Sequence, residues 1–170
     1  MAKIDVGDRA PDFELAGTGG RTYRLDDYLG DGRNGVILAF YPGDFTAGCT
    51  KQFCSYRDDS EKLDALGIPV LGISPQSVDS HERWTEEKRL NVPLLADEGM
   101  EVAKAYGVTG WASPLAWLGE RRAVTPGGWF TQRAVFVVDG EGVVRFRNAS
   151  FTGTSFLDVE DLERAVASVA

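Results

Sequence analysis

The two cysteines of the chain, Cys49 and Cys54, are the residues best suited to chemistry. An apolar run over 35–41 is typical of a buried strand, and Pro42 stops it. Helical spacing begins soon afterwards, so we expect Cys49 near the start of a helix. Free backbone N–H groups and the positive end of the helix dipole stabilise a thiolate at that position. Because the thiolate is the nucleophilic form of cysteine, the sequence predicts that Cys49 is a reactive thiol.

Cleavage of a peroxide bond requires hydrogen-bond donors, and the sequence offers candidates both beside Cys49 and further along the chain. When one peroxide oxygen is attacked, the other leaves as an anion, so both oxygens need donors. Thr46 can place its hydroxyl beside the sulfur or an incoming oxygen, and Pro42, which has no N–H, can shield the sulfur from water. Arg133 immediately precedes an apolar run at 134–138 and is the best candidate for a guanidinium donor, which stays charged.

Purely structural roles for the same residues are the alternative interpretation. The two cysteines can be an inert buried pair, Thr46 can act only as a helix N-cap, and Arg133 can be an ordinary arginine at a strand end. A zinc site needs about four ligands, which two cysteines and the distant His81 do not supply. His81 lies in a charged helical stretch, so we expect it on the surface and not in a Cys–His catalytic arrangement.

The elements expected around these residues alternate between strands and helices. Apolar runs and apolar–polar alternation predict the strands, and apolar residues at helical spacing predict the helices. The expected strands are 12–15, 22–25, 35–41, 70–74, 93–97, 134–138 and 143–147, and the expected helices are 49–67, 77–90, 100–106 and 159–169, with a helical turn at 26–29. This order implies a largely parallel centre covered by helices on both faces. The sequence therefore predicts a single domain over 1–170 with an α/β fold: a thioredoxin-like three-layer sandwich with a mixed central sheet and an N-terminal β-hairpin.

Composition excludes several classes of partner and compartment. The net charge of −8 is spread along the chain, which argues against a nucleic-acid binder and against an anionic membrane surface. No apolar run approaches the ~20 residues needed to span a bilayer, and the N-terminal residues lack the apolar stretch of a signal peptide. In a reducing compartment a close pair of cysteines is more often redox-active than structural. We therefore expect a cytoplasmic protein.

A segment rich in Trp, Pro and Gly occupies 110–131 and is expected to be a loop. Trp111, Trp117, Trp129 and Phe130 either pack on the core or a second subunit, which we favour, or line a pocket for a bulky hydroperoxide.

The residues around the cysteines resemble those of the peroxiredoxins. The hallmark of that family is Pro-x-x-x-Thr-x-x-Cys, which Pro42, Thr46 and Cys49 match. The Q-type or bacterioferritin-comigratory-protein subfamily often carries a second cysteine five residues further on, at the position of Cys54. Further similarity lies at 7–13, 72–75 and 133–139, and in all it spans most of 4–166.

This resemblance implies a role for each residue. Cys49 would be the peroxidatic cysteine and Cys54 the resolving one, Thr46 and Arg133 would orient the peroxide, and Pro42 would shield the site. The family uses no metal, haem or flavin, and many members of the subfamily are recycled by thioredoxin. We therefore expect a thioredoxin-dependent thiol peroxidase for hydrogen peroxide and organic hydroperoxides, without a cofactor, acting as a monomer or weak homodimer. The alternatives are a peroxide-sensing redox switch and a general disulfide oxidoreductase, although the latter usually carries Cys-x-x-Cys.

The spacing of the cysteines also predicts motion during the cycle. Residues five apart on an α-helix have Cα atoms roughly 8 to 9 Å apart, whereas a disulfide usually needs less than about 7 Å. We therefore expect Cys49 to become a sulfenic acid, the first helical turns to unwind, and Cys54 to form the disulfide that a dithiol reduces.

Overall fold

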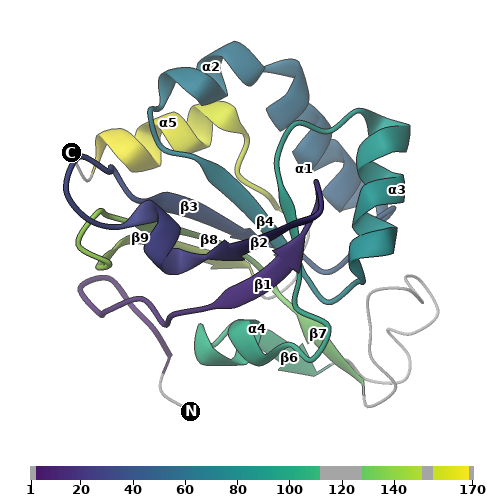
Figure 1. Cartoon of the computed structure of the whole chain (residues 1–170), viewed down its shortest axis with the longest axis horizontal. Coiled ribbons are helices and arrows are strands. Elements are labelled where there is room, and N and C mark those ends of the chain that lie inside the picture. Colours follow the sequence, from purple (N-terminus) through teal and green to yellow (C-terminus); the bar gives the residue numbers. More distant parts are fainter. Residues whose placement is uncertain (1–2, 112–127, 151–154, 169–170) are drawn as a thin grey trace.

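A seven-stranded mixed sheet runs through the computed structural model, which describes residues 3–111, 128–150 and 155–168 (Figure 1). The order of its strands is β2-β1-β5-β4-β3-β8-β9. The bounds are β1 Glu14–Gly17, β2 Arg21–Arg24, β3 Val36–Phe40, β4 Val70–Ser74, β5 Leu94–Ala96, β8 Arg133–Val138 and β9 Val144–Ser150. Strands β3, β4 and β5 are parallel, whereas the β1–β2 hairpin and the β8–β9 pair flank them in antiparallel fashion. The predicted mixed sheet with an N-terminal hairpin is confirmed.

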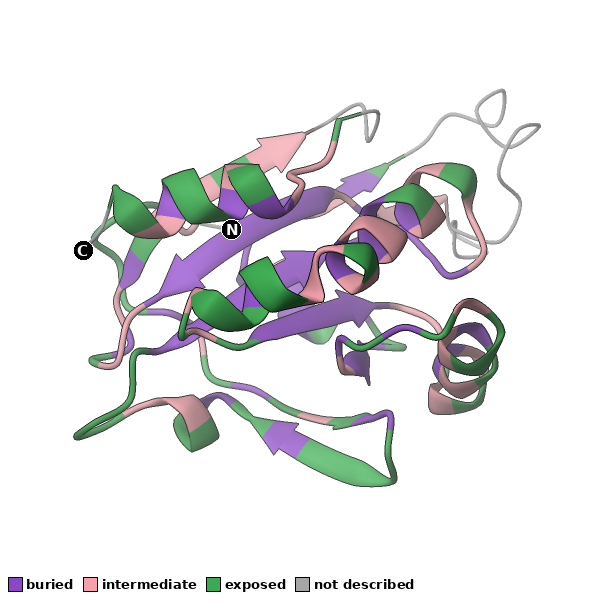
Figure 2. Cartoon of the chain, turned by 90° about the horizontal axis from the view of Figure 1, so that it is seen from above, coloured by how far each residue is buried: buried purple, intermediate pink, exposed green. Residues whose placement is uncertain are grey.

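The central strands send alternate side chains into two cores, one on each face of the sheet. In β3, Val36, Leu38 and Phe40 enter one core, and Ile37 and Ala39 enter the other. This alternation explains why the strand is a continuous apolar run in the sequence, since both of its faces are covered. Figure 2, seen from above, shows the buried strands behind helices that are exposed along part of their surface.

Helices cover both faces and complete the three layers. Their bounds are η1 Leu25–Tyr28, a 3-10 turn, and α1 Ala47–Asp58, α2 Ser60–Ala65, α3 Val78–Lys88, α4 Glu101–Ala105 and α5 Val159–Ala167. The core that includes Ile37 also holds side chains of α1, α3 and α5, whereas the other core holds side chains of η1 and α4. In the described part of the chain, no helix is both long enough and apolar enough to cross a membrane.

Two expectations about local structure are corrected. The single helix expected over 49–67 is interrupted at Asp59, where φ −101° and ψ 31° leave the helical region and separate α1 from α2. The ends of the loop expected at 110–131 instead form an antiparallel pair, β6 Thr109–Trp111 and β7 Trp129–Thr131. The residues between these strands, 112–127, lie outside the described part of the chain.

Candidate active site

The site begins at the loop that joins β3 to α1. The strand ends at Phe40, and Tyr41 and Pro42 follow it, both buried. Because proline has no backbone N–H, Pro42 cannot continue the ladder of hydrogen bonds, and the chain turns toward α1. This places Pro42 where the sequence predicts it, just after the end of a buried strand and five residues before α1 begins.

Cys49 is the third residue of α1, so its predicted position near a helix start is confirmed. Thr46 is the N-cap: its Oγ1 accepts a hydrogen bond from the Cys49 backbone N at 3.4 Å and donates one to the Gly43 carbonyl oxygen at 3.1 Å. Thr46 is therefore a capping residue, whatever else it does. Cys49 is completely buried, and both Cys49 and Cys54 are free thiols.

Arg133 lies at the start of β8 and reaches the sulfur of Cys49. Its Nη2 donates a hydrogen bond to the Cys49 Sγ at 3.2 Å, and its Nη1 donates one to Oε1 of Gln52. Only 4% of Arg133 is exposed, so it is not a surface arginine. A Cβ on Gly48 would lie 3.1 Å from Arg133 Nη2, so glycine at this position leaves the guanidinium room to approach the helix. A buried guanidinium against a sulfur favours the thiolate form.

Gln52 and Tyr56 support this arrangement, and the sequence analysis missed both. Gln52 is completely buried, and its Nε2 donates to the Tyr56 hydroxyl at 2.9 Å, which donates to the Leu157 carbonyl oxygen at 2.8 Å. Burial raises the pKa of Tyr56 far above its ordinary value, so the hydroxyl keeps its proton. The available signal was the spacing, because positions three and seven after Cys49 share its face of a helix.

Cys54 lies in α1 with Cys49, so the helix holds the two thiols apart. It is half-buried and packs against the same core as Cys49. As expected from five residues of helical rise and rotation, the intact helix is incompatible with a disulfide between them.

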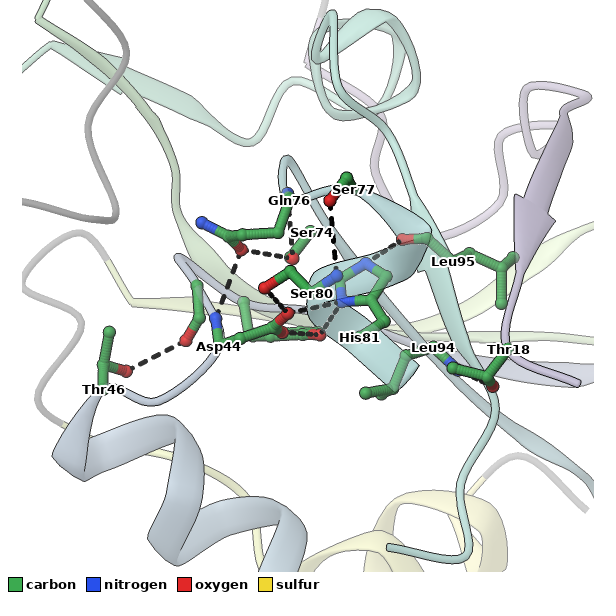
Figure 3. Close-up of polar contacts among 12 residues, drawn as sticks. Thr18, Asp44, Thr46, Ser74, Gln76, Ser77, Ser80, His81, Leu94 and Leu95 are labelled. Atoms are coloured by element: carbon green, nitrogen blue, oxygen red, sulfur yellow. Dashed lines mark hydrogen bonds and ion pairs between the residues drawn. The ribbon is translucent and has the colours of Figure 1, made fainter. Parts of the chain in front are cut away.

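The expectation that His81 lies on the surface is wrong. His81 is completely buried on α3, with Nδ1 2.7 Å from Asp44 Oδ2 and Nε2 3.1 Å from the Leu95 carbonyl oxygen (Figure 3). Tyr41 donates to the other Asp44 oxygen at 2.7 Å. Burial, followed by the charge of Asp44, raises the pKa of Tyr41 well above its ordinary value. The charged residues around His81 suggested an exposed helix because only one side of α3, which includes Trp84, faces the core.

The aromatic residues of the expected 110–131 loop are only partly described. Trp111 and Trp129 pair across β6 and β7 and are 56% and 48% exposed, so neither is packed into the core. Trp117 lies outside the described residues. A subunit contact and a pocket for a bulky hydroperoxide therefore both remain predictions for these side chains.

Comparison with known proteins places this chain in a family. Residues 6–147 match the model of the AhpC/TSA family. The chain is 34% identical over 139 residues to peroxiredoxin Bcp of Bacillus subtilis, which covers 82% of this chain and 81% of that protein. It is 37% identical over 145 residues to the chloroplastic peroxiredoxin Q of Populus jackii, covering 85% of this chain but 60% of that longer protein.

Solved structures agree with the fold. The crystal structure of peroxidoxin BcpB from Mycobacterium tuberculosis superposes with a TM-score of 0.75 at 28% identity, over 98% of this chain and 96% of that one. A cysteine-to-serine mutant of PrxQ from Xylella fastidiosa superposes with a TM-score of 0.76 over 97% and 95% of the two chains, and at 19% identity it shows the fold alone.

Proposed function

The chain belongs to the AhpC/TSA family and is a thiol peroxidase, and on this premise we propose that Cys49 is the residue that attacks the hydroperoxide. The observation that carries this proposal is the 3.2 Å hydrogen bond from Arg133 to the Cys49 sulfur at the N-terminal turn of α1. The guanidinium and the helix dipole together stabilise a thiolate at one atom.

In the first step, the Cys49 thiolate attacks one oxygen of the hydroperoxide and the O–O bond breaks. The other oxygen leaves with the bonding electrons and takes up a proton, which gives an alcohol or water, and Cys49 becomes a sulfenic acid. Arg133 stabilises the charge that develops on these oxygens, because its donors are fixed and already desolvated. Thr46 Oγ1 has a lone pair left after its bond to the Cys49 N–H, and this lone pair orients the peroxide hydroxyl.

Pro42 contributes to this site because it has no backbone N–H group. It is buried at the end of β3 and offers no N–H to water, so it helps to keep bulk solvent from the sulfur. A dry site strengthens the contact between Arg133 and the thiolate.

In the second step, the first turns of α1 unwind and the Cys54 thiol attacks the Cys49 sulfenic acid. A disulfide forms between the two sulfurs, and the hydroxyl leaves as water. A dithiol protein of the thioredoxin type then reduces the disulfide by exchange and is itself oxidised.

Several further features of the working enzyme are part of the same proposal. We place the whole activity in one domain over 1–170 that works in the cytoplasm, where both thiols stay reduced between turnovers. It acts as a monomer or weak homodimer, with a hydroperoxide and a dithiol protein as its only partners, and without nucleic acid or membrane.

The test follows one turnover and then many. Reduced protein is mixed with one equivalent of hydrogen peroxide, Trp fluorescence is recorded by stopped flow, and the products are mapped by mass spectrometry. Steady-state consumption of peroxide is then measured with thioredoxin, its reductase and NADPH. We expect a rapid phase, a Cys49–Cys54 disulfide and many equivalents of peroxide consumed.

Two cysteine variants serve as matched controls for this experiment. Cys49→Ser should abolish both the rapid fluorescence phase and the steady-state consumption of peroxide. Cys54→Ser should keep the oxidation of Cys49 but stop turnover with thioredoxin. Unchanged turnover in Cys54→Ser would remove its role as the resolving cysteine. Oxidation that stops after one equivalent in the wild-type protein would favour a peroxide-sensing switch.

A further inference from the structure

The loop that presents Cys49 holds an unfavourable backbone conformation. Phe45, which precedes the N-cap Thr46, has φ +62°, in the left-handed region that a non-glycine residue with a bulky side chain rarely adopts. Such a conformation persists only where the surroundings hold it in place. What holds residues 43–46 therefore also fixes Thr46 and the start of α1.

Asp44 is the residue that anchors this loop in the interior. Its Oδ1 accepts a hydrogen bond from the Tyr41 hydroxyl at 2.7 Å, and its Oδ2 accepts one from Ser80 Oγ at 2.8 Å. The same Oδ2 lies 2.7 Å from His81 Nδ1, and the Asp44 backbone N–H donates to Gln76 Oε1 at 3.2 Å (Figure 3). Asp44 is 2% exposed, so its carboxyl group is held by these contacts inside the protein.

His81 joins Asp44 to α3. Its Nε2 faces the Leu95 carbonyl oxygen at 3.1 Å, and a carbonyl can only accept, so this nitrogen holds a proton. Its Nδ1 lies 2.7 Å from Asp44 Oδ2 and 3.4 Å from the Tyr41 hydroxyl, and a proton on this nitrogen makes the contact with Asp44 an ion pair. With a proton on each ring nitrogen, His81 is a completely buried imidazolium that is bonded at both nitrogens.

We propose that the buried Asp44–His81 ion pair is a positioning device for the peroxidatic cysteine, an inference that rests on the proposed function. The pair connects the loop after β3 to α3 and so fixes the position of the loop. Two hydrogen bonds of the loop in turn fix the position of Cys49. Gly43 O accepts from the Thr46 hydroxyl, and the Thr46 oxygen accepts from the Cys49 N–H.

The pair also sets the charge of the loop that leads to the sulfur. Tyr41 donates a hydrogen bond to Asp44 and packs in the same core cluster as Cys49. An imidazolium at position 81 balances the charge of Asp44, so the pair adds no net negative charge to this loop. Asp44 and Tyr41 are the titratable groups that contact His81 among the described residues.

The test compares His81→Gln, Asp44→Asn and the double variant with the wild-type protein, and Asp97→Asn is the matched control. Asp97 is also a buried carboxylate, but its oxygens accept from the backbone N–H groups of Val102 and Ala103 in α4 and not from the partners of Asp44. The rate constant for oxidation of Cys49 by hydrogen peroxide is measured in a single turnover, and the free energy of unfolding is measured in urea.

We expect His81→Gln to lower the oxidation rate constant about 10- to 100-fold, because small misplacements of reacting groups have effects of that size. The double variant should be faster than His81→Gln alone, since it leaves no unpaired buried charge. Asp97→Asn should lose stability but keep the rate constant.

The opposite results would overturn the proposal. The proposal fails if the single variants are oxidised as fast as the wild type, or if the double variant is oxidised more slowly than either single one. It also fails if the oxidation rate constant of the Asp97→Asn control falls in proportion to its lost stability. A wild-type protein that fails to react with peroxide would instead refute the proposed function.

A measurement on the unmodified protein keeps the proposal testable if a variant does not fold. His81 is the only histidine in the chain, so a long-range 1H–15N spectrum contains the signals of one imidazole ring. We expect protons on both ring nitrogens at neutral pH. A ring with one unprotonated nitrogen would overturn the ion pair.

Discussion

Helices α1 and α5 pack against the same core but hold their first turns in different ways. In α5, Asp158 accepts from the Asp161 backbone N at 2.9 Å, and Asp161 accepts from the Asp158 backbone N at 3.1 Å. This capping box and the acidic residues of the first turn stabilise the helix from within its own sequence. In α1, the cap is a single 3.4 Å bond to Thr46, and 47–50 hold no acidic residue.

The difference matches what each helix has to do in the proposed cycle. The first turns of α1 depend on contacts outside the helix, above all those of Arg133 with Cys49 and Gln52. Oxidation of the sulfur removes the negative charge that Arg133 favours, so it weakens a contact that holds these turns. The cap of α5 lies within its own first turn and is independent of the redox state.

The largest effect on the first turns of α1 and on the reactivity of Cys49 is expected from Arg133→Lys. Lysine keeps the positive charge, but a single ammonium cannot reproduce the fork that joins Cys49 and Gln52. We expect the rate constant for oxidation of Cys49 to fall about 100-fold, equivalent to about 2.7 kcal/mol of transition-state stabilisation. Stopped-flow fluorescence with hydrogen peroxide measures it. A variant with the wild-type rate constant would remove Arg133 from the site.

The sequence predicts this catalytic face better than it predicts its supports. Apolar runs such as Val70–Ser74 predict the central strands, because burial on both faces leaves a pattern that needs no knowledge of the partner. Arg133 and Thr46 are found because each adjoins an element whose end can be predicted. His81 and Gln52 are missed because their burial depends on residues 37 and 81 positions away in the chain, Asp44 and Arg133.

The second-largest effect is expected from Tyr56→Phe, which removes a hydroxyl that connects α1 to the start of α5. The Tyr56 hydroxyl joins Gln52 of α1 to the carbonyl of Leu157, just before α5. Its removal leaves both partners short of a bond inside the protein, and we expect a loss of about 1 to 1.5 kcal/mol in the free energy of unfolding. Urea denaturation at about pH 8 measures it.

The same variant makes a prediction about alkaline pH. Burial raises the pKa of Tyr56 in the folded state, so above the ordinary value of about 10 the unfolded chain loses a proton that the folded protein keeps. This contribution to stability is present below about pH 10 and is lost as the pH rises further. Tyr56→Phe should lose stability less steeply there, by up to about 1.4 kcal/mol per pH unit. Equal slopes would mean that the tyrosine titrates normally.

A smaller effect tests α5, where Asp158→Ala removes the capping box. Loss of an N-cap typically costs about 1 kcal/mol, and we expect that change in the free energy of unfolding. The rate constants for Cys49 oxidation and for disulfide formation should stay at their wild-type values, because the cap takes no part in the unwinding of α1. Slower disulfide formation in this variant would show that the two helices do not act separately.

The smallest effect is expected from adding an acidic residue to the first turn of α1, which has none. Ala47 is exposed at the first position of α1, where Ala47→Glu adds an acidic side chain and Ala47→Gln is a neutral control of the same shape. The added charge should stabilise the helix by about 0.5 kcal/mol through the dipole. Because the helix must unwind before Cys54 can reach Cys49, we expect the glutamate variant to form the disulfide about twofold more slowly than the glutamine variant. High salt should reduce this difference, since it screens an exposed charge. If the two variants form the disulfide at the same rate while differing in stability, unwinding of the first turn does not limit that step.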